Sequence, residues 1–99
     1  MIDGGDIVVA DLGHEKRERV IVISSARLHR VRGRALVAPV VPGPPDFVLD
    51  PWRCHAGDAV FAVDHLTTTT MDRLLEIVGR STLSELRIMR AAAAMVIAG

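Results

Sequence analysis

The order of the β-rich segments constrains the fold more than any other feature of the sequence. Residues 6–11, 19–25, 34–41 and 58–64 are rich in Val, Ile and Ala and are separated by polar or Gly- and Pro-containing segments, as is typical of strands. The run at 19–25 is β-branched almost throughout, which favours a strand covered on both faces. These segments follow one another without long helices between them, which excludes a doubly wound parallel sheet. The sequence therefore predicts a small antiparallel sheet that curls into a barrel.

Shorter segments complete this pattern. We expect further short strands at 46–50 and 74–79, and a short helical turn or loop at 26–32. Pro-rich and polar composition predicts a turn at 42–45 and a loop at 51–57. None of these segments repeats another, so we expect a single domain over the whole chain. The core of so small a domain is thin, and a second subunit would help to complete it.

The end of the chain carries the clearest helical pattern. Thr82 and Glu85 match a capping box, in which each side chain bonds the backbone N–H of the other residue. Apolar side chains then recur at helical spacing, and the Ala-rich run 91–94 has a high helix propensity. The expected fold class is therefore mainly β with one C-terminal helix that covers the barrel. The apolar positions of this helix are Leu86, Met89, Ala93, Val96 and Ile97.

Composition excludes several classes of protein. Cys54 is the single cysteine, so no intrachain disulfide can form and nothing requires an oxidising compartment. The start of the chain is acidic, unlike a secretory signal, and no apolar run approaches the roughly 18 residues of a membrane span. We expect a cytoplasmic protein with no membrane segment. The histidines match no zinc-ligand spacing, so no metal site is predicted.

Charge is unevenly distributed, although the formal net charge of the chain is zero. Residues 14–34 hold seven Lys and Arg but only two Glu, which is a net charge of +5. A basic fifth of a neutral protein favours a local anionic partner such as a nucleic acid. The alternative is a pair of solvated loops with no ligand.

Five stretches along the chain resemble, in order and spacing, those of one known family. The first reads Gly-Asp-Ile-Val-Val-Ala-Asp-Leu-Gly at 5–13, and the second reads Val-Ile-Val-Ile-Ser at 20–24. They are followed by Val-Ala-Pro-Val at 37–40, Val-Asp-His-Leu at 63–66 and the segment 74–80, before the closing helix. Together they resemble the MazF/PemK/Kid toxins and the related CcdB gyrase poisons, which share an SH3-like barrel.

The resemblance implies a function as well as a fold. It implies the toxin component of a type II toxin–antitoxin system, in the form of a symmetric homodimer whose cognate MazE-like antitoxin occupies an RNA groove. The implied activity is cleavage of single-stranded RNA (mRNA), without a metal or other cofactor, by attack of a 2′-hydroxyl on the adjacent phosphate. This reaction needs a base, an acid and donors to the charged phosphorane.

In the family, an Arg that opens the second strand and a Thr after the third strand carry much of this chemistry. Without a gap Glu18 stands at the Arg position, whereas a one-residue contraction brings Arg19 there. Arg17 takes the place of Arg19 as the candidate for this arginine if the loop before the second strand is rearranged. Val41 stands at the Thr position and has no hydroxyl, so the threonines at 67–70 are an alternative source of one.

The candidate site residues lie in the basic loop and near it. Arg19, or failing that Arg17, would stabilise the phosphorane through its planar guanidinium. Glu15 and His14 would take part in proton transfer, since imidazole titrates near neutral pH. The candidate RNA-binding residues are Lys16, Arg27, Arg30, Asp64 and His65.

Two other functions remain open at this stage. Glu18 and Val41, at the family's Arg and Thr positions, favour a protein-binding toxin without nuclease chemistry, as CcdB-type members are for gyrase. However, the Trp-Gly-Ile end of CcdB is absent, because this chain ends Val-Ile-Ala-Gly at 96–99. The other alternative is a catalytically degenerate protein that only binds an antitoxin.

Overall fold

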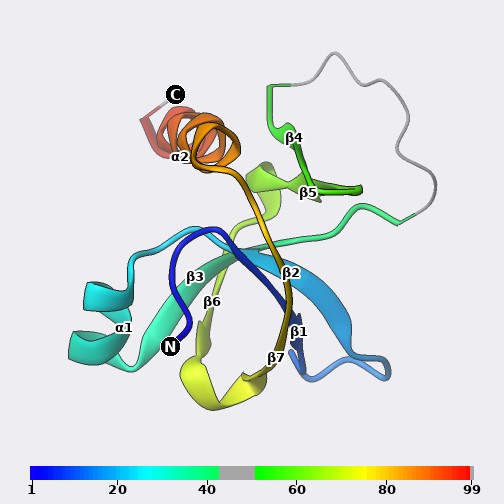
Figure 1. Cartoon of the computed structure of the whole chain (residues 1–99), viewed down its shortest axis with the longest axis vertical. Helices are drawn as coiled ribbons and strands as arrows, with labels where there is room; N and C mark the ends of the chain where they lie inside the picture. Colours follow the sequence, from blue (N-terminus) through cyan, green and yellow to red (C-terminus); the bar gives the residue numbers. More distant parts are fainter. Residues whose placement is uncertain (43–50, 99) are drawn as a thin grey trace.

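The computed structural model describes residues 1–42 and 51–98 and contains a curled sheet, a separate hairpin and two α-helices (Figure 1). The strands of the curled sheet are β1 (Asp6–Ala10), β2 (Glu18–Val22), β3 (Arg34–Pro39), β6 (Thr67–Thr70) and β7 (Leu74–Arg80). The other elements are the hairpin strands β4 (Arg53–Ala56) and β5 (Ala59–Ala62), the helices α1 (Ala26–Arg32) and α2 (Leu83–Ala98), and the short 3-10 turns η1 (Val63–His65) and η2 (Met71–Arg73). The five-stranded sheet has the order β6-β3-β2-β1-β7, and its pairings are antiparallel. A mainly β fold with a C-terminal helix is therefore confirmed.

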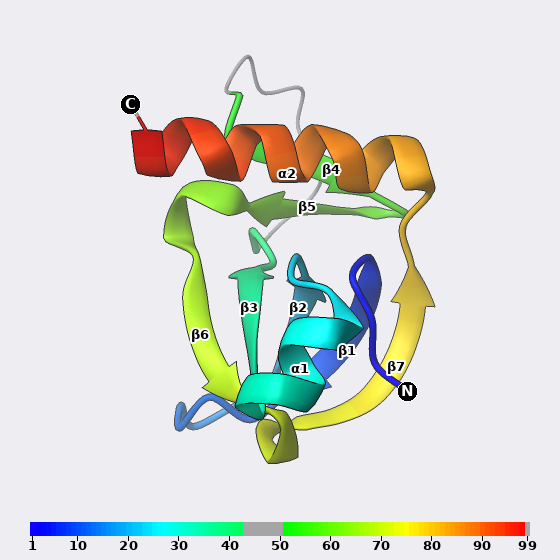
Figure 2. The same ribbon diagram turned by 90° about the vertical axis from the view of Figure 1, so that its left-hand side faces the viewer.

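The central strands are covered on both faces, as the run at 19–25 predicts. In β2, Ile21 belongs to one apolar cluster and Val20 and Val22 belong to the other, because successive side chains of a strand point to opposite faces. The side chains of β1 are divided between the two clusters in the same way. The first cluster lies between the sheet, the hairpin and α2, and the second lies inside the curl of the sheet, where it includes a side chain of β7 (Figure 2).

The predicted capping box is present at the start of α2. The N–H of Thr82 donates to Glu85 Oε1 at 2.7 Å, and the N–H of Glu85 donates to Thr82 Oγ1 at 3.1 Å. The carbonyl of Thr82 also accepts the N–H of Leu86 at 3.0 Å. Two backbone N–H groups at the helix start are thus satisfied by side chains, which sets where the helix begins.

α2 runs across the hairpin and closes the first apolar cluster (Figure 2). Leu86, Met89 and Ala93 are buried as predicted. Val96 and Ile97 are 37% and 78% exposed, so the last turn of the helix carries apolar side chains into solvent. No helix within the described ranges is both long and apolar enough to cross a bilayer.

The sequence predicts a loop at 51–57, and this is wrong because β4 occupies most of that segment. Burial alternates along β4, with Cys54 and Ala56 buried, and Ala56 pairs with Ala59 across a two-residue turn. Gly57 in this turn has a φ of +61°, in the left-handed region that such tight turns favour. A Gly-Asp turn between two short segments, the second of them wholly apolar, is the signal for this hairpin.

The remaining predicted segments differ from the observed ones mainly at their ends. The strand predicted at 58–64 ends at Ala62, because η1 follows it. The segment 26–32 is the helix α1. The strand predicted at 46–50 and most of the turn predicted at 42–45 lie outside the described residues. The strands predicted at 6–11, 19–25, 34–41 and 74–79 are confirmed by β1, β2, β3 and β7 with shifted ends.

The N-terminal turn links α1 to the sheet. Asp3 Oδ1 accepts the N–H of Ala26, the first residue of α1, at 2.8 Å and the N–H of Gly4 at 2.7 Å. Asp3 thereby replaces the cap that Ser25 does not provide, since Ser25 makes no side-chain cap bond. The Ala26 N–H, followed by the Gly4 N–H, holds the pKa of the Asp3 carboxyl below its ordinary value.

Asp6 is fully buried at the start of β1, where its carboxylate has two partners. Asp6 Oδ1 accepts the Nε–H of Arg80 at 2.8 Å, and Asp6 Oδ2 accepts the N–H of Asp3 at 2.9 Å. Arg80 is the last residue of β7, so this ion pair fastens the end of β7 to β1. A buried charge needs such partners, because leaving it unpaired costs several kcal/mol.

Candidate nucleic-acid groove

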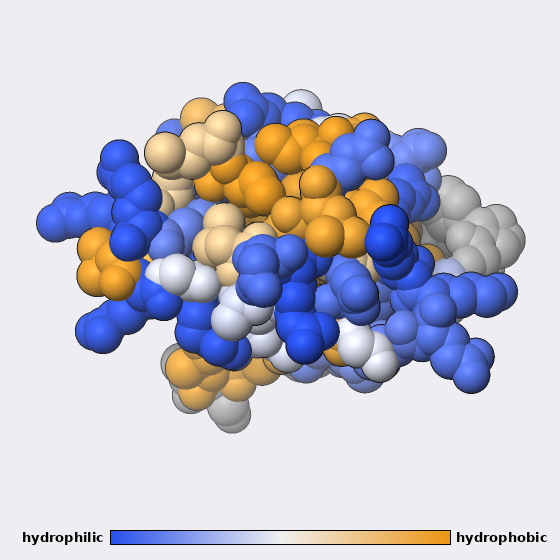
Figure 3. All heavy atoms as spheres, turned by 90° about the horizontal axis from the view of Figure 1, so that it is seen from below, coloured by the Kyte–Doolittle hydropathy of each residue, from blue (hydrophilic) through white to orange (hydrophobic). Residues whose placement is uncertain are grey.

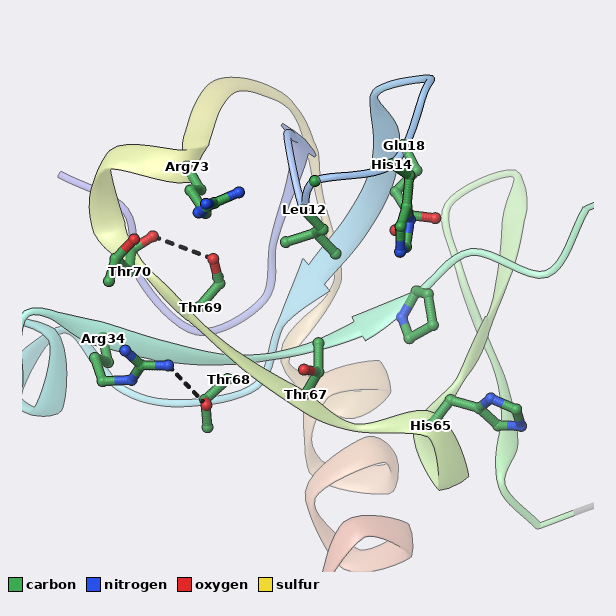
Figure 4. Close-up of a pocket in the computed structure, with 12 residues that line it drawn as sticks. Leu12, His14, Glu18, Arg34, His65, Thr67, Thr68, Thr69, Thr70 and Arg73 are labelled. Carbon is green, nitrogen blue, oxygen red and sulfur yellow. Dashed lines mark hydrogen bonds and ion pairs between the residues drawn. The ribbon is translucent and has the colours of Figure 1, made fainter.

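A groove of about 690 Å³ lies between β6 and the loop that joins β1 to β2 (Figure 4). Figure 4 shows arginines at one end of it and histidines with a glutamate at the other. We call these the arginine end (Arg34 and Arg73) and the histidine end (His14, Glu18 and His65). The lining residues are Leu12, Gly13, His14, Glu18, Arg34, Pro39, His65, Thr67, Thr68, Thr69, Thr70 and Arg73.

β6 supplies a row of threonines along the groove. The register pairs Thr70 with Arg34, so β6 runs along β3 at the edge of the sheet. Thr69 is buried and its hydroxyl donates to the carbonyl of Thr70 at 3.4 Å, whereas Thr67 and Thr68 are exposed. The fold thus brings threonine hydroxyls to the groove.

An imidazole–carboxylate pair shapes the histidine end. His14 Nδ1 lies 3.2 Å from Glu18 Oε1, because the loop after β1 folds back onto the start of β2. A carboxylate can only accept a hydrogen bond, so this contact favours a hydrogen on Nδ1. Gly13, with a φ of +88°, and Asp11 Oδ1, which accepts the Gly13 N–H at 3.1 Å, form the start of this loop.

A second imidazole–carboxylate pair lies at the same end. His65 Nε2 lies 3.5 Å from Asp64 Oδ2, and Asp64 Oδ1 lies 3.6 Å from Arg53 Nη1. The side chains of His14 and His65 are 67% and 63% exposed, which leaves both rings accessible to a ligand. Across residues 1–42 and 51–98, no three His, Cys, Asp or Glu side chains are placed to hold a metal ion.

The arginine end is built from the start of β3 and the end of η2. Arg34 Nη2 donates to Thr68 Oγ1 at 3.0 Å. Arg73 Nη1 donates to the carbonyl oxygen of Asp11 at 3.2 Å. Among the described residues, neither guanidinium has a carboxylate within ion-pair distance. The positive charge of both side chains is therefore left for a ligand.

Arg19 points away from the groove. Glu18 lines the groove, and successive side chains of a strand point to opposite faces. Arg19 Nη1 instead lies 3.5 Å from Asp58 Oδ1 in the β4–β5 turn, with both side chains exposed. The groove position at the start of β2 thus belongs to Glu18, as in the ungapped comparison with the family.

The structure brings His14 and His65 to the groove from the predicted set. The other predicted residues are not among those that line it. They are Arg19 on β2, Glu15, Lys16 and Arg17 in the exposed loop after His14, Arg27 and Arg30 on the exposed side of α1, and Asp64 beside His65.

Glu18, Arg34 and Arg73 line the groove and are absent from the predicted set. Glu18 opens β2 and Arg34 opens β3, so a charged residue at the start of a predicted strand is the signal that could have found them. No sequence pattern predicts η2, so only the fold shows that Arg73 lies at the groove. Arg34 ends the basic segment 14–34, for which the sequence predicts an anionic partner, so Arg73 is the cationic groove residue that sequence reasoning missed.

Comparison with known proteins identifies the fold. No protein-family model matches the chain, and no curated protein matches it. An endoribonuclease in complex with its cognate antitoxin, from a mycobacterial species, matches in structure with a TM-score of 0.82 and 16% identity, over 99% of this chain and 96% of that chain. The chain has the MazF fold.

Two structures from Deinococcus radiodurans agree with this assignment. A chain of a MazE–MazF crystal structure has a TM-score of 0.82 and 18% identity, over 98% of this chain and 96% of that chain. A MazF crystal structure has a TM-score of 0.76 and 21% identity, over 99% of this chain and 97% of that chain. The MazF fold extends over nearly the whole chain, as the sequence resemblance implies.

Proposed function

We propose that this protein is the toxin component of a type II toxin–antitoxin system and that it cleaves single-stranded RNA without a metal ion. The observation that carries the proposal is the histidine end, where two imidazoles, each beside a carboxylate, line a groove whose other end is cationic. The MazF fold supports it, because the structures of similar fold include endoribonucleases.

The groups at the histidine end match the needs of the reaction. His14 Nε2 takes the proton of a ribose 2′-hydroxyl as that oxygen attacks the adjacent phosphorus. The bond from phosphorus to the 5′ oxygen breaks, and protonated His65 gives that oxygen a proton. The products are a 2′,3′-cyclic phosphate and a 5′-hydroxyl. Glu18 holds the ring of His14 in place through the contact at 3.2 Å.

The loop that carries His14 supplies further groups for this reaction. Arg17 or Arg19 stabilises the charge on the phosphorane, and Glu15 assists proton transfer. Arg17 is in the same loop as His14, whereas Arg19 would first have to leave its ion pair with the β4–β5 turn. Lys16 in the same loop and Asp64 beside His65 are proposed to bind RNA at the groove, whereas Arg27 and Arg30 on α1 would contact RNA only outside the groove.

The proposal includes a symmetric homodimer and a cognate MazE-like antitoxin in the cytoplasm. Large apolar side chains are exposed on β7 and α2, including Ile77 at 47% and Ile88 at 61%. Figure 3 shows apolar side chains gathered in the middle of one face, and such patches are typical of interfaces. A second copy related by a two-fold axis would cover them. Solved structures of similar fold include complexes with antitoxins.

Cleavage of a long unstructured RNA by the purified protein in EDTA tests the proposal. We expect fragments with 5′-hydroxyl ends. His14→Ala should lower the rate by about 100-fold or more, because general acid–base catalysis contributes about 10²–10⁴. His55→Ala is the matched control, because His55 is exposed on β4 and does not line the groove. Arg17→Ala and Arg19→Ala identify which arginine acts.

Each contrary result identifies a different function. An absence of cleavage at high protein concentration, together with growth inhibition in cells, would favour a CcdB-like protein-binding toxin. An absence of both effects would favour a protein that only binds an antitoxin. Equal loss of activity in His14→Ala and His55→Ala would contradict the role given to the histidine end.

A further inference from the structure

The two ends of the groove differ in how their charges are matched. At the histidine end, each imidazole lies beside a carboxylate, at 3.2 and 3.5 Å. At the arginine end, the hydrogen bonds recorded for Arg34 and Arg73 go to neutral oxygens, the Thr68 hydroxyl and the Asp11 carbonyl. A guanidinium has five N–H donors in one plane. Most donors of both arginines are therefore left for an anionic ligand.

Asp72 is the acidic residue next to the arginine end. Its carboxylate makes no ion pair with Arg73 within the described part of the chain. The Thr70 hydroxyl donates to it instead and lowers the pKa of the Asp72 carboxyl. Asp72 is exposed, so solvent and salt screen its charge. One screened carboxylate reduces the positive potential of two guanidinium groups but does not cancel it.

The fold fixes the two arginines relative to each other. Gly33 ends α1 with a φ of +65°, and its carbonyl accepts the N–H of Met71, the first residue of η2, at 3.1 Å. Arg34 follows Gly33 and Arg73 ends η2, so this bond joins the segments that carry them. The N–H of Asp11 also donates to the carbonyl of Arg73 at 3.0 Å. The arginine end is thus attached to three parts of the fold.

Arg34 is too far from the histidine end to bind the same phosphate, whereas Arg73 reaches toward the loop that carries His14 through its bond to the Asp11 carbonyl. Arg34 and Pro39 both line the groove, at opposite ends of β3. Pro39 pairs with Val20, close to Glu18 at the histidine end. Five residue steps along a strand span about 17 Å. The groove therefore accommodates more than one nucleotide of an extended strand.

We infer that Arg34 and Arg73 form a second phosphate-binding site, which holds the backbone of the RNA on one side of the bond that is cleaved. This inference rests on the proposed function, because the ligand is the same single-stranded RNA. The Thr68 hydroxyl accepts from Arg34, so its own hydrogen can be donated to the same phosphate.

The site affects affinity and substrate length but not the sequence that is cleaved, because phosphate contacts carry no base information. The same contacts exist before and during the reaction, so they lower KM without raising kcat. Short RNAs that reach only the histidine end do not make these phosphate contacts and have a higher KM. Longer RNAs make the contacts and have a lower KM.

The experiment measures the affinity of a long single-stranded DNA oligonucleotide, which lacks the 2′-hydroxyl and is not cleaved, over a series of salt concentrations. Each phosphate contact that is lost lowers the slope of log affinity against log salt by about 0.7 for a single strand. We expect Arg34→Ala and Arg73→Ala each to lower the magnitude of this slope by about 0.7. Arg87→Ala, at an exposed position on α2, is the matched control and should have the same slope as wild type. Thr68→Val should weaken binding without changing the slope.

Four further results bear on the inference. A short oligonucleotide that covers only the histidine end should bind wild type and Arg34→Ala alike. Unchanged slopes in both arginine variants, with thermal melting like that of wild type, would overturn the site, as would a wild type that binds no oligonucleotide. Binding that depends on Arg34 and Arg73 without RNA cleavage in EDTA would leave the site standing and remove only the proposed nuclease activity.

Discussion

The two edge strands of the curled sheet present opposite kinds of surface. β6 consists of four threonines and lines the groove. β7 exposes Leu75, Ile77 and Val78, each at 45% to 47%. Hydroxyl groups offer donors and acceptors to a polyanion, whereas apolar side chains are stabilised only when another apolar surface covers them. One sheet thus has an edge suited to nucleic acid and an edge suited to protein.

The two edges also differ in how they pair with the rest of the sheet. β6 pairs with β3 in an unbroken register of four residues. β7 pairs with β1 through two register shifts and ends at the Asp6–Arg80 ion pair. Such irregularities break the alternation of a strand, which explains why the consecutive residues 75–78 are all exposed. The regular pairing of β6 leaves its threonine hydroxyls in a row. The irregular pairing of β7 exposes more of its apolar side chains.

The largest effect is expected from a charge placed on the apolar edge. Ile77→Asp should raise the dissociation constant of the proposed homodimer by about 30-fold or more, because an uncompensated charge in an apolar contact costs at least about 2 kcal/mol. Analytical ultracentrifugation measures this constant. Thr68→Asp puts the same charge on β6 and should self-associate like wild type. Equal effects of the two substitutions, or a wild type that stays monomeric, would break the contrast between the edges.

A smaller effect is expected when the attachment of β7 is weakened. Arg80→Ala leaves the buried Asp6 carboxylate with the Asp3 N–H as its recorded partner. We expect the free energy of unfolding to fall by about 2 kcal/mol and Tm to fall by roughly 10 °C, as measured by urea and thermal unfolding. Arg87→Ala should leave both unchanged. Wild-type stability in Arg80→Ala would show that the strand register, and not the ion pair, holds this edge.

The smallest effect concerns Asp3, which joins α1 to the start of β1. Its pKa in the folded state is lowered from the ordinary value of 3.8. Asp3 therefore stabilises the protein above that value and loses this contribution as the pH falls through the lower folded pKa. The carboxylate is exposed, so the contribution is about a few tenths of a kcal/mol. Asp3→Asn keeps an oxygen acceptor without titrating, and its unfolding free energy should fall less steeply than that of wild type between about pH 5 and 2. A parallel fall would contradict this assignment.

Much of the fold follows from patterns between neighbours in the sequence. The β-branched run that becomes β2 and the capping box of α2 depend on adjacent residues, and both are confirmed. β4 escapes prediction because its Arg-Cys-His-Ala sequence has little β propensity, and its pairing with β5 depends on a two-residue turn.

The groove is harder to predict because its contacts join residues that are distant in the sequence. Arg34 bonds Thr68 across 34 positions, and Arg73 bonds Asp11 across 62. No local pattern encodes such contacts. Glu18 and Arg19 are adjacent, so an uncertainty of one residue in alignment moves a side chain to the other face of the strand. The family resemblance leaves that choice open, and the β2 geometry places Glu18 at the groove.

The division of the groove between early and late parts of the chain has a consequence for synthesis. One wall comes from residues 12–39 and the other from residues 65–73. During translation the first wall leaves the ribosome before the second has been made. The contacts between the two walls can form only after β6 and η2 have also been made. The groove is therefore complete only after most of the chain has been made.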